Sequence, residues 1–272
     1  MISKFQIIVL HTIKHGDSGM VIQCYSDTAG RMSVYLRGAS RKGTVLANLH
    51  RLNILDIVTY STGSSMPAIR EMAPAVMLPS VRTDIYKNSI AIFISELLTK
   101  SIREVEPNPV LYNFLASSIQ LLEHSREGIA NFHIYFLVHL SKMMGFMPLD
   151  NYSPDTPVFN ILSADFGEID TGRHPYAGPD REMPPAYSGG CLTDAGKYSG
   201  SASVPERSFD FSAAESALLH RILNTPVTSL GEIKCRGELR FSFAKQMVRY
   251  LSHHLGSPLE IKSLDILHEV FK

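Results

Sequence analysis

The sequence predicts an α+β protein in which an N-terminal five-stranded β-barrel is followed by an α-helical bundle. Short segments with a period of two, separated by turn residues, follow one another through roughly the first 75 residues. From Pro79 onward the period changes to about 3.6, which is typical of helices. The chain has 272 residues, enough for roughly two domains. We expect a barrel domain over residues 1–80 and a helical domain over 81–272, the latter interrupted at about 150–208.

Five short strands are expected in the N-terminal part. In the first three, two sets of residues alternate along the chain, as on the two faces of a strand, and turn residues such as Gly16 and Gly30 separate these three strands. The expected strands cover residues 5–10, 21–25, 32–37, 52–60 and 68–72. Five antiparallel strands in this length are typical of a small Greek-key barrel such as the OB-fold, and an SH3-like barrel fits the same pattern.

Helices are expected where a capping residue precedes apolar residues at helical spacing. Asp84 and Asn108 can each cap a helix, and Pro109 suits the first position of the second. A third helix is expected over residues 129–144, ending at Gly145. These three helices should pack together through wide apolar faces.

Helices resume near the C-terminus. Ser212 and Glu215 have the spacing of a capping box, and a long helix is expected over residues 238–254 before Gly256. A last helix should follow Ser263. Because this segment is too short to form its own core, we expect it to complete the bundle that begins at residue 81.

Residues 150–208 are rich in Pro, Gly, Ser and Asp. One hairpin is expected there, in which Val158–Leu162 turns at Asp165-Phe166-Gly167 into Glu168–Asp170. The stretch from Arg173 to Ser208 has almost no periodicity, so we expect it to be a mobile excursion.

Several enzyme classes lack their motifs in this sequence. It contains no Gly-x-x-x-x-Gly-Lys-Ser/Thr loop, no Gly-x-Gly-x-x-Gly, no Gly-x-Ser-x-Gly and no His-Glu-x-x-His. We therefore expect a protein that is not an enzyme and that uses no cofactor. An unrecognised hydrolase is the alternative, and it would need a nucleophile and a base that converge in a pocket.

The cysteines and the apolar runs limit the compartment. Cys24, Cys191 and Cys235 occur without any Cys-x-x-Cys, so we expect neither a metal site nor a disulfide framework. Cys24 alternates within a strand and is expected in the core. No apolar run reaches the roughly 18 residues that span a bilayer, and the N-terminal run is too short for a signal peptide, so a cytoplasmic protein is expected.

Charge is distributed unevenly along the chain. Lys+Arg and Asp+Glu both number 26, so the formal net charge is zero. Residues 1–80 nevertheless carry 8 basic and 4 acidic groups, whereas residues 151–208 carry 4 and 8. The barrel is therefore a basic segment whose charge the excursion balances, and the neutral total does not exclude nucleic-acid binding.

One strand and its loop carry the clearest signal for nucleic acid. Arg31, Tyr35 and Arg37 share one strand face, opposite the apolar residues between them. The strand leads into a loop with Arg41 and Lys42, where mobile cations and backbone N–H groups can meet phosphates. Tyr35, with Tyr25 as a second candidate, can stack on bases. The alternative is an ordinary solvated face with basic residues.

Two features of the expected helices admit a binding role. Arg236, Arg240, Lys245 and Arg249 lie on one helix, but successive 100° steps place the first two and the last two on nearly opposite sides. We expect mainly solvated charges, with Arg240, Lys245 and Arg249 as possible secondary contacts to DNA or a partner. The aromatic third helix either offers an apolar groove to an acidic peptide tail or is simply core; its residues are Phe132, Tyr135, Phe136 and Leu140.

Several motifs resemble a known family. Val9-Leu10-His11, Gly16-Asp17-Ser18, the run from Tyr25 to Arg31 and the run from Arg37 to Gly43 follow one another in order, and Arg249–Gly256 forms a second block near the end. Together they resemble the bacterial recombination mediator family RecO. The resemblance implies an OB-fold joined to a helical domain, with no enzymatic turnover.

The same resemblance implies function and partners. RecO-like proteins bind single- and double-stranded DNA and anneal complementary strands. They bind the C-terminal tail of single-stranded DNA-binding protein and associate with RecR, so that RecA can be loaded. We expect this chain to be a DNA repair and recombination mediator, with a general OB-fold nucleic-acid binder of replication or translation as the alternative. The residues expected to bind DNA are Arg31, Tyr35, Arg37, Arg41, Lys42 and Arg51.

The sequence departs from the family's pattern in three places. His50-Arg51-Leu52 stands where many relatives have Gln-Pro-Phe. The middle excursion has only Cys191, so no zinc finger is expected. The third helix begins Ile129-Ala130-Asn131, without the arginines that lie near the family's peptide pocket, and Arg126 is the nearest cation.

Overall fold

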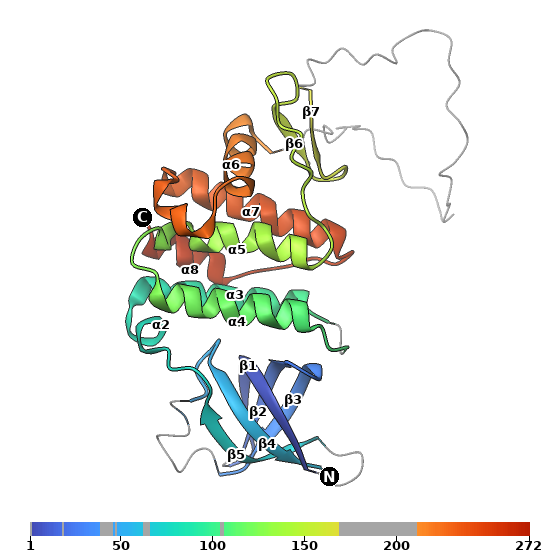
Figure 1. Ribbon diagram of the computed structural model, residues 1–272, viewed down its shortest axis with the longest axis vertical. Coiled ribbons are helices and arrows are strands. Elements are labelled where there is room, and N and C mark those ends of the chain that lie inside the picture. Colours follow the sequence, from blue (N-terminus) through green and yellow to red (C-terminus); the bar gives the residue numbers. More distant parts are fainter. Residues whose placement is uncertain are drawn as a thin grey trace, which may run out of the picture.

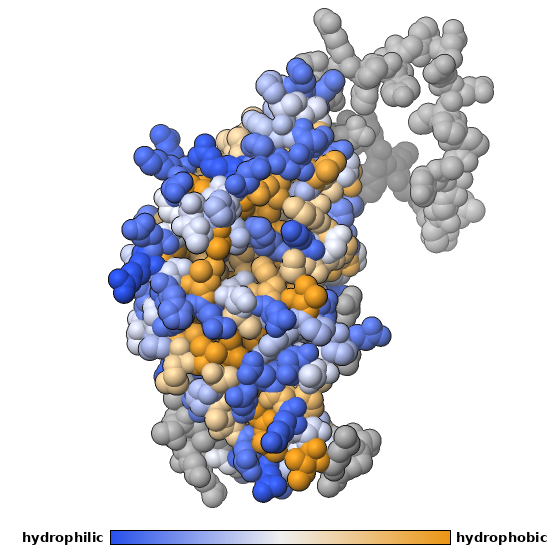
Figure 2. All heavy atoms as spheres, in the orientation of Figure 1, coloured by the Kyte–Doolittle hydropathy of each residue, from blue (hydrophilic) through white to orange (hydrophobic). Residues whose placement is uncertain are grey.

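The computed structural model describes residues 2–17, 19–38, 46, 48–61, 66–103, 106–168 and 211–272. A β-barrel forms one end of the molecule, and helices are stacked on it in successive layers (Figure 1). Figure 2 shows hydrophilic residues over most of this face, with apolar patches over the helical region and near the lower end of the barrel. No helix in the described ranges is long and apolar enough to cross a membrane.

The barrel contains five strands in the closed order β1-β2-β3-β5-β4. Their bounds are β1 Ile2–His15, β2 Gly19–Ser26, β3 Gly30–Leu36, β4 Ile54–Tyr60 and β5 Ala68–Pro74. The predicted five-stranded barrel is confirmed. The all-antiparallel expectation is wrong at one pair, because β3 and β5 run parallel where Tyr35 faces Ala68. That contact closes the barrel across strands that are not consecutive.

The stagger of the barrel brings distant strand positions together. Around the barrel, Ile2 on β1 pairs with Tyr60, Tyr60 with Ala68, Ala68 with Tyr35, Tyr35 with Val21, and Val21 with Ile13. This path returns to β1 eleven residues beyond the residue at which it started. Such a stagger tilts the strands around the axis. It also places Tyr35, Tyr60 and Ala68 side by side in one row, although they lie on three different strands.

Alternate strand residues fill the barrel. Cys24 is fully buried as expected, and burial raises the pKa of its thiol to about 12. The interior side chains are Ile7, Val9, Ile22, Cys24, Val34, Leu36, Leu49, Leu55, Ile57 and Ile69. Removing this apolar surface from water stabilises the barrel and points the intervening residues outward.

The helices begin where the capping residues predict. Asp84 accepts hydrogen bonds from the backbone N–H groups of Tyr86 at 2.8 Å and Lys87 at 3.0 Å, and Asn108 accepts one from Leu111 at 3.0 Å. The Ser212–Glu215 capping box is also present. The helices are α2 Pro79–Thr83, α3 Ile85–Ser101, α4 Pro109–His124, α5 Ile129–Met143, α6 Ala213–Leu223, the 3-10 helix Val227–Glu232, α7 Gly237–His254 and α8 Ser263–Val270.

The C-terminal helices complete the bundle, as expected. α8 packs on α3, and the Glu96 carboxylate on α3 accepts hydrogen bonds from the backbone N–H groups of Lys262 at 3.2 Å and Ser263 at 2.8 Å. Burial alone raises the pKa of Glu96, but these bonds and those from Lys100 Nζ and Ser263 Oγ outweigh it and lower the pKa to about 2. A charge on α3 therefore caps the start of α8.

The predicted hairpin exists, but its second arm was misplaced. β6 Val158–Asn160 pairs with β7 Asp165–Gly167, so the pairing precedes residues 168–170. The Asn160 side chain accepts hydrogen bonds from the N–H groups of Leu162 and Ser163, which turns the chain early. The mobile excursion predicted over 173–208 lies outside the described residues.

Barrel and helices share one core and several polar contacts. Tyr25 on β2 is 1% exposed and packs in the cluster that also contains the helical residues. The suggestion that Tyr25 stacks on bases is therefore wrong, because α3 covers that end of the barrel. Ser95 Oγ donates to Leu10 O, and Tyr112 Oη donates to Gln6 Oε1 at 3.0 Å. These contacts hold the first helical layer against the barrel.

Candidate nucleic-acid interface

Strand β3 presents the predicted alternation. Val34 and Leu36 point into the barrel, whereas Tyr35 is half-buried on the outer face and Arg37 is exposed just beyond the strand. Arg31 has the same parity as Tyr35. The strand therefore orients these side chains outward, as the period of two predicted.

Tyr35 lies in a hollow of about 310 Å³ at the end of the barrel remote from the helices, which we call the distal hollow. The His15 ring meets the Tyr35 ring edge-on, with centroids 5.8 Å apart. Tyr35 also covers Gly19, where an added β-carbon would lie 2.7 Å from Tyr35 Cε2. The hollow is lined by His15, Val21, Tyr35, Arg37, Tyr60, Met66 and Ala68.

The chemistry of this distal hollow suits an unstacked base and its phosphate. Tyr35 and Tyr60 supply aromatic faces, Met66 an apolar contact, and Arg37 a cation at the edge. The hollow lies at the start of β2 and the end of β4, beside the β1–β2 and β4–β5 loops. OB-folds bind oligonucleotides at this position, over strands 2 and 3.

Of the seven lining residues, the sequence predicted a binding role only for Tyr35 and Arg37; among the others, His15, Tyr60 and Met66 have side chains suited to contact a base. Each lies next to an expected turn, where function concentrates on loops, and Tyr60 ends an expected strand. Their common location follows from barrel closure, which the pattern of a single strand does not show.

Arg31 does not line the distal hollow but binds to the end of helix α3. Its guanidinium donates to the carbonyl oxygens of Thr99, at 2.5 Å, and Ile102, which end helix α3. Burial, followed by the charge of Arg103, lowers the pKa of Arg31. Arg31 thus links the barrel to the helical region, and its charge lies about four residues along β3 from the distal hollow.

Of the other cations predicted to bind DNA, Arg51 lies away from the distal hollow, and Arg41 and Lys42 lie outside the described residues. Arg51 is half-buried beside His11, whose pKa is lowered by burial and by the charge of Arg51. The adjoining Leu52 N–H donates to Val9 O at 2.7 Å, which places this segment against the middle of β1. Arg41 and Lys42 belong to the undescribed part of the loop.

The cations of α7 do not form one surface. Arg240 donates to Asn131 Oδ1 at 3.1 Å and to Cys235 O at 2.9 Å, inside the bundle. Lys245 Nζ lies 4.0 Å from the centroid of the Phe241 ring and 3.9 Å from an Asp265 oxygen. Arg249 donates to the Gln246 side chain at 2.9 Å. The three side chains have separate local partners.

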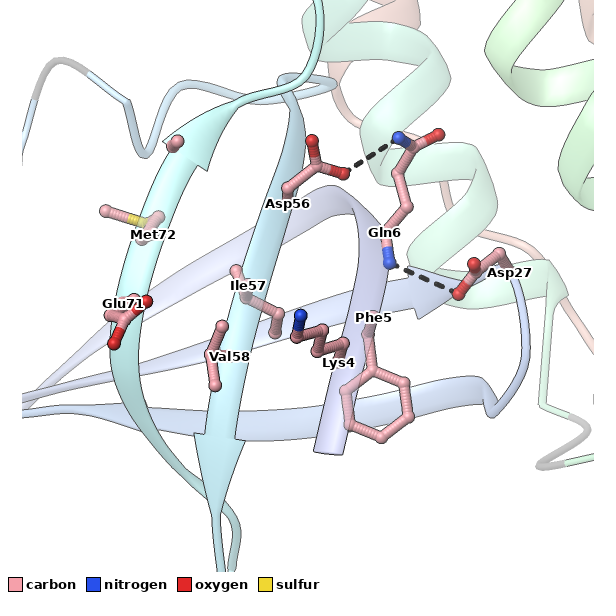
Figure 3. A pocket seen from close by; sticks show the side chains of 10 residues that line it. Lys4, Phe5, Gln6, Asp27, Asp56, Ile57, Val58, Glu71 and Met72 are labelled. Carbon is pink, nitrogen blue, oxygen red and sulfur yellow. Dashed lines mark hydrogen bonds between the residues drawn. The ribbon is translucent and has the colours of Figure 1, made fainter. Parts of the chain in front are cut away.

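A second hollow on the barrel is acidic. Its volume is about 570 Å³. Figure 3 shows it across β5, β4 and the first half of β1. Gln6 joins two of its carboxylates: its backbone N–H donates to Asp27 at 3.2 Å and its Nε2 to Asp56 at 2.8 Å (Figure 3). Glu71 is the third carboxylate and Lys4 the cation. Negative charge here repels phosphates, so the two barrel faces differ in what they can bind.

The aromatic residues of α5 are mainly core. Phe132, Phe136 and Leu140 are buried, and Tyr135 packs against the His139 ring at a centroid distance of 4.0 Å. Phe132, Phe136 and Leu140 therefore belong to the core and are not available to line a surface groove. A hollow of about 480 Å³ lies instead at the C-terminal end of α5; its lining includes Ile102, Arg103, Leu111, Met143, Met144, Phe146 and Leu255.

The described residues contain no group of three His, Cys, Asp or Glu side chains that could hold a metal ion. Cys235 is partly buried and donates to the neighbouring Arg236 carbonyl. Cys191 lies outside the described ranges.

Comparisons with known proteins match both parts of the chain. The family model described as Recombination protein O N terminal matches residues 1–76, and that described as Recombination protein O C terminal matches residues 82–151. DNA repair protein RecO of Christiangramia forsetii is 26% identical over 275 residues, covering 100% of both chains. The protein of that name from Flavobacterium psychrophilum is 25% identical over 98% of both chains, and that from Bacteroides fragilis is 32% identical over 66% of this chain and 76% of its own.

These matches confirm the resemblance found in the sequence motifs and the prediction that the protein is not an enzyme. A closed five-stranded barrel and a following helical region fit the two matched segments. The chain belongs to the RecO family of bacterial DNA repair proteins, which act as recombination mediators.

Proposed function

We propose that this chain holds single-stranded DNA on the outer face of β2 and β3, with bases stacked in the distal hollow. The observation that carries the proposal is the joint placement of Tyr35, Tyr60 and Arg37 in one hollow beside the two barrel loops. Double-stranded DNA would meet the same basic side through its phosphates. The acidic hollow on the other barrel face leaves this side as the one that attracts nucleic acid.

Fluorescence anisotropy with a labelled oligo-dT, over a series of salt concentrations, tests the DNA site. Tyr35→Ala removes a stacking surface worth about 1–3 kcal/mol per base, so the affinity should fall roughly 5- to 150-fold. Arg37→Gln should reduce the magnitude of the slope of log K against log salt by about 0.7, the value for one phosphate contact on a single strand.

Arg70→Gln is the matched control. Arg70 is an exposed barrel cation on β5, whose Nε lies 3.3 Å from the Glu71 carboxylate beside the acidic hollow. Its replacement should leave affinity and salt slope unchanged. If Tyr35→Ala and Arg37→Gln bind as the wild type does, the DNA site lies elsewhere.

As a mediator, the protein would also anneal complementary strands and, with RecR, help load RecA onto DNA covered by single-stranded DNA-binding protein. Annealing that requires the barrel and the helical region together distinguishes this role from simple OB-fold binding. A pull-down should retain both purified RecR and single-stranded DNA-binding protein; retention of neither would favour the general nucleic-acid binder.

The hollow at the end of α5 is our candidate for the acidic tail of single-stranded DNA-binding protein. Methionine and phenylalanine side chains form an apolar floor, and Arg103 supplies a cation at its side. Ser101 Oγ, which also lines this hollow, is buried without a hydrogen-bond partner among the described residues. An acidic, amphipathic peptide end would satisfy these groups.

Titration of a labelled tail peptide tests this partner site. Met144→Asp places a carboxylate in the hollow and should abolish binding at micromolar protein. Met147→Asp is the control, because Met147 is 48% exposed and does not line the hollow. Equal binding by both variants would exclude this hollow as the tail site.

A further inference from the structure

A cleft of about 510 Å³ lies where the barrel meets the C-terminal end of α3. It is lined by Arg31, Thr99, Lys100, Arg103, Pro258 and Glu260. Three cations and one carboxylate therefore border this junction cleft. Lys100 and Arg103 belong to the helical region, and the sequence motifs gave them no role.

Two of the three cations are fixed in place. Arg31 donates to the carbonyl oxygens of Thr99 and Ile102, and Lys100 Nζ donates to Glu96 Oε1 at 2.6 Å and to Glu260 O. These bonds order the positive charges before any ligand arrives, which reduces the entropy lost on binding.

The third cation, Arg103, is exposed at the cleft. Arg103 is close enough to Arg31 for its charge to lower the pKa of the Arg31 guanidinium, in addition to the larger effect of burial. Two guanidinium groups thus repel each other across the cleft. An anion placed between them would relieve that repulsion.

The junction cleft lies in line with the distal hollow. Arg31 and Tyr35 have the same parity on β3 and are four residues apart, which corresponds to about 13 Å at 3.3 Å per residue. At about 3.4 Å per stacked nucleotide, this distance is spanned by roughly four nucleotides. OB-fold sites cover about 4–16 nucleotides, so one bound strand can reach both places.

We propose that the junction cleft is a phosphate site, which takes a backbone phosphate of the DNA strand about four nucleotides from the base stacked on Tyr35. The inference rests on the proposed DNA site of the barrel and extends it to Lys100 and Arg103. Because the cleft joins β3 to α3, the strand contacts the barrel and the helical region at once.

Arg103→Gln is the main test, because Arg103 is exposed and its replacement removes none of the hydrogen bonds of Arg31 or Lys100 described above. With oligo-dT, the magnitude of the slope of log K against log salt should fall by about 0.7. Between 50 and 200 mM salt the variant should therefore lose about 2.6-fold less affinity than the wild type. Arg103→Lys keeps a cation for the phosphate and should restore the slope.

Arg221→Gln provides a control for general charge. Arg221 is an exposed cation on α6, on the far side of the helical region from the barrel (Figure 1). Its replacement should leave the slope unchanged. An unchanged slope in Arg103→Gln, or an equal change in both variants, would overturn the phosphate site.

Two further arms separate the possible causes. If Tyr35→Ala weakens binding while Arg103→Gln keeps the wild-type slope, the barrel site stands and the junction site falls. The reverse result would support a phosphate contact in the junction cleft but would overturn the base stacked on Tyr35 and the four-nucleotide spacing. Inorganic phosphate, titrated as competitor at constant ionic strength, tests for a free anion site. Arg103-dependent phosphate inhibition with an unchanged DNA slope would overturn the assignment to the DNA backbone.

Discussion

Replacing Arg31 tests whether a cation on the barrel also holds the helical region in place. In Arg31→Gln the guanidinium can no longer donate to the carbonyl oxygens of Thr99 and Ile102, so the end of α3 loses a charged cap. Gln is shorter and neutral, and the barrel interior is untouched because Arg31 points outward.

The magnitude follows from two charge-assisted hydrogen bonds. Such bonds contribute about 1.5–3 kcal/mol each when buried, but Arg31 is only partly buried and water screens its charge. We therefore expect about 1 kcal/mol each, or a loss of about 2 kcal/mol in the free energy of unfolding. In a chain of this size that lowers Tm by roughly 4–8 °C.

Urea denaturation followed by far-UV circular dichroism measures the change, with Arg37→Gln as the matched control. Arg37 belongs to the same basic group but is exposed, so its replacement should alter stability by no more than about 0.5 kcal/mol. If Arg31→Gln is as stable as Arg37→Gln, then Arg31 does not join the two parts of the molecule and the reasoning fails.

Three other changes have expected outcomes. Gly19→Ala should displace the Tyr35 ring, because the added β-carbon would lie 2.7 Å from both Tyr35 Cε2 and His15 O. The affinity for oligo-dT should therefore drop, and an unchanged Kd would contradict the role of Tyr35 in binding. Tyr112→Phe removes the hydrogen bond to Gln6 and should lower the free energy of unfolding, measured by urea titration, by about 1 kcal/mol. An unchanged free energy of unfolding would show that this bond does not stabilise the contact between barrel and helices. Burial, with a smaller effect of the Arg240 charge, lowers the pKa of His133 to about 3. As the pH falls, the His133 imidazole is therefore protonated in the unfolded chain before it is protonated in the folded protein. The contribution of neutral His133 to the free energy of unfolding is fully present above about pH 6.5 and is lost as pH falls toward 3, by up to about 1.4 kcal/mol per pH unit. His133→Gln should therefore flatten the pH dependence of the free energy of unfolding, measured from pH 7 to 4.5.

Local elements of the fold could be predicted because their causes are local. Asp84, Asn108 and the Ser212–Glu215 box each bond to backbone groups within three residues, so sequence spacing alone marks the start of the helix. The strand alternation likewise identified the outward parity of Tyr35 and Arg37. The prediction failed at the hairpin, where the Asn160 side chain tightens the turn.

Which outward positions stay accessible could not be predicted in this way. Tyr25 and Tyr35 both point out of the barrel, yet α3 buries the first while the second lines a hollow. Alternation distinguishes the two faces of a strand but carries no information about what packs on the outer one.

The sequence by itself determined the α+β class, the family motifs, the helix caps and the basic β3 strand, since these depend on residues close together in the chain. Only the tertiary structure decided how those residues are used. Barrel closure brings Tyr60 and Met66 to Tyr35, and helix packing brings Thr99 and Arg103 to Arg31 across about seventy residues. Charge and aromatic character are properties of single residues, whereas a binding surface depends on which distant residues the fold brings together.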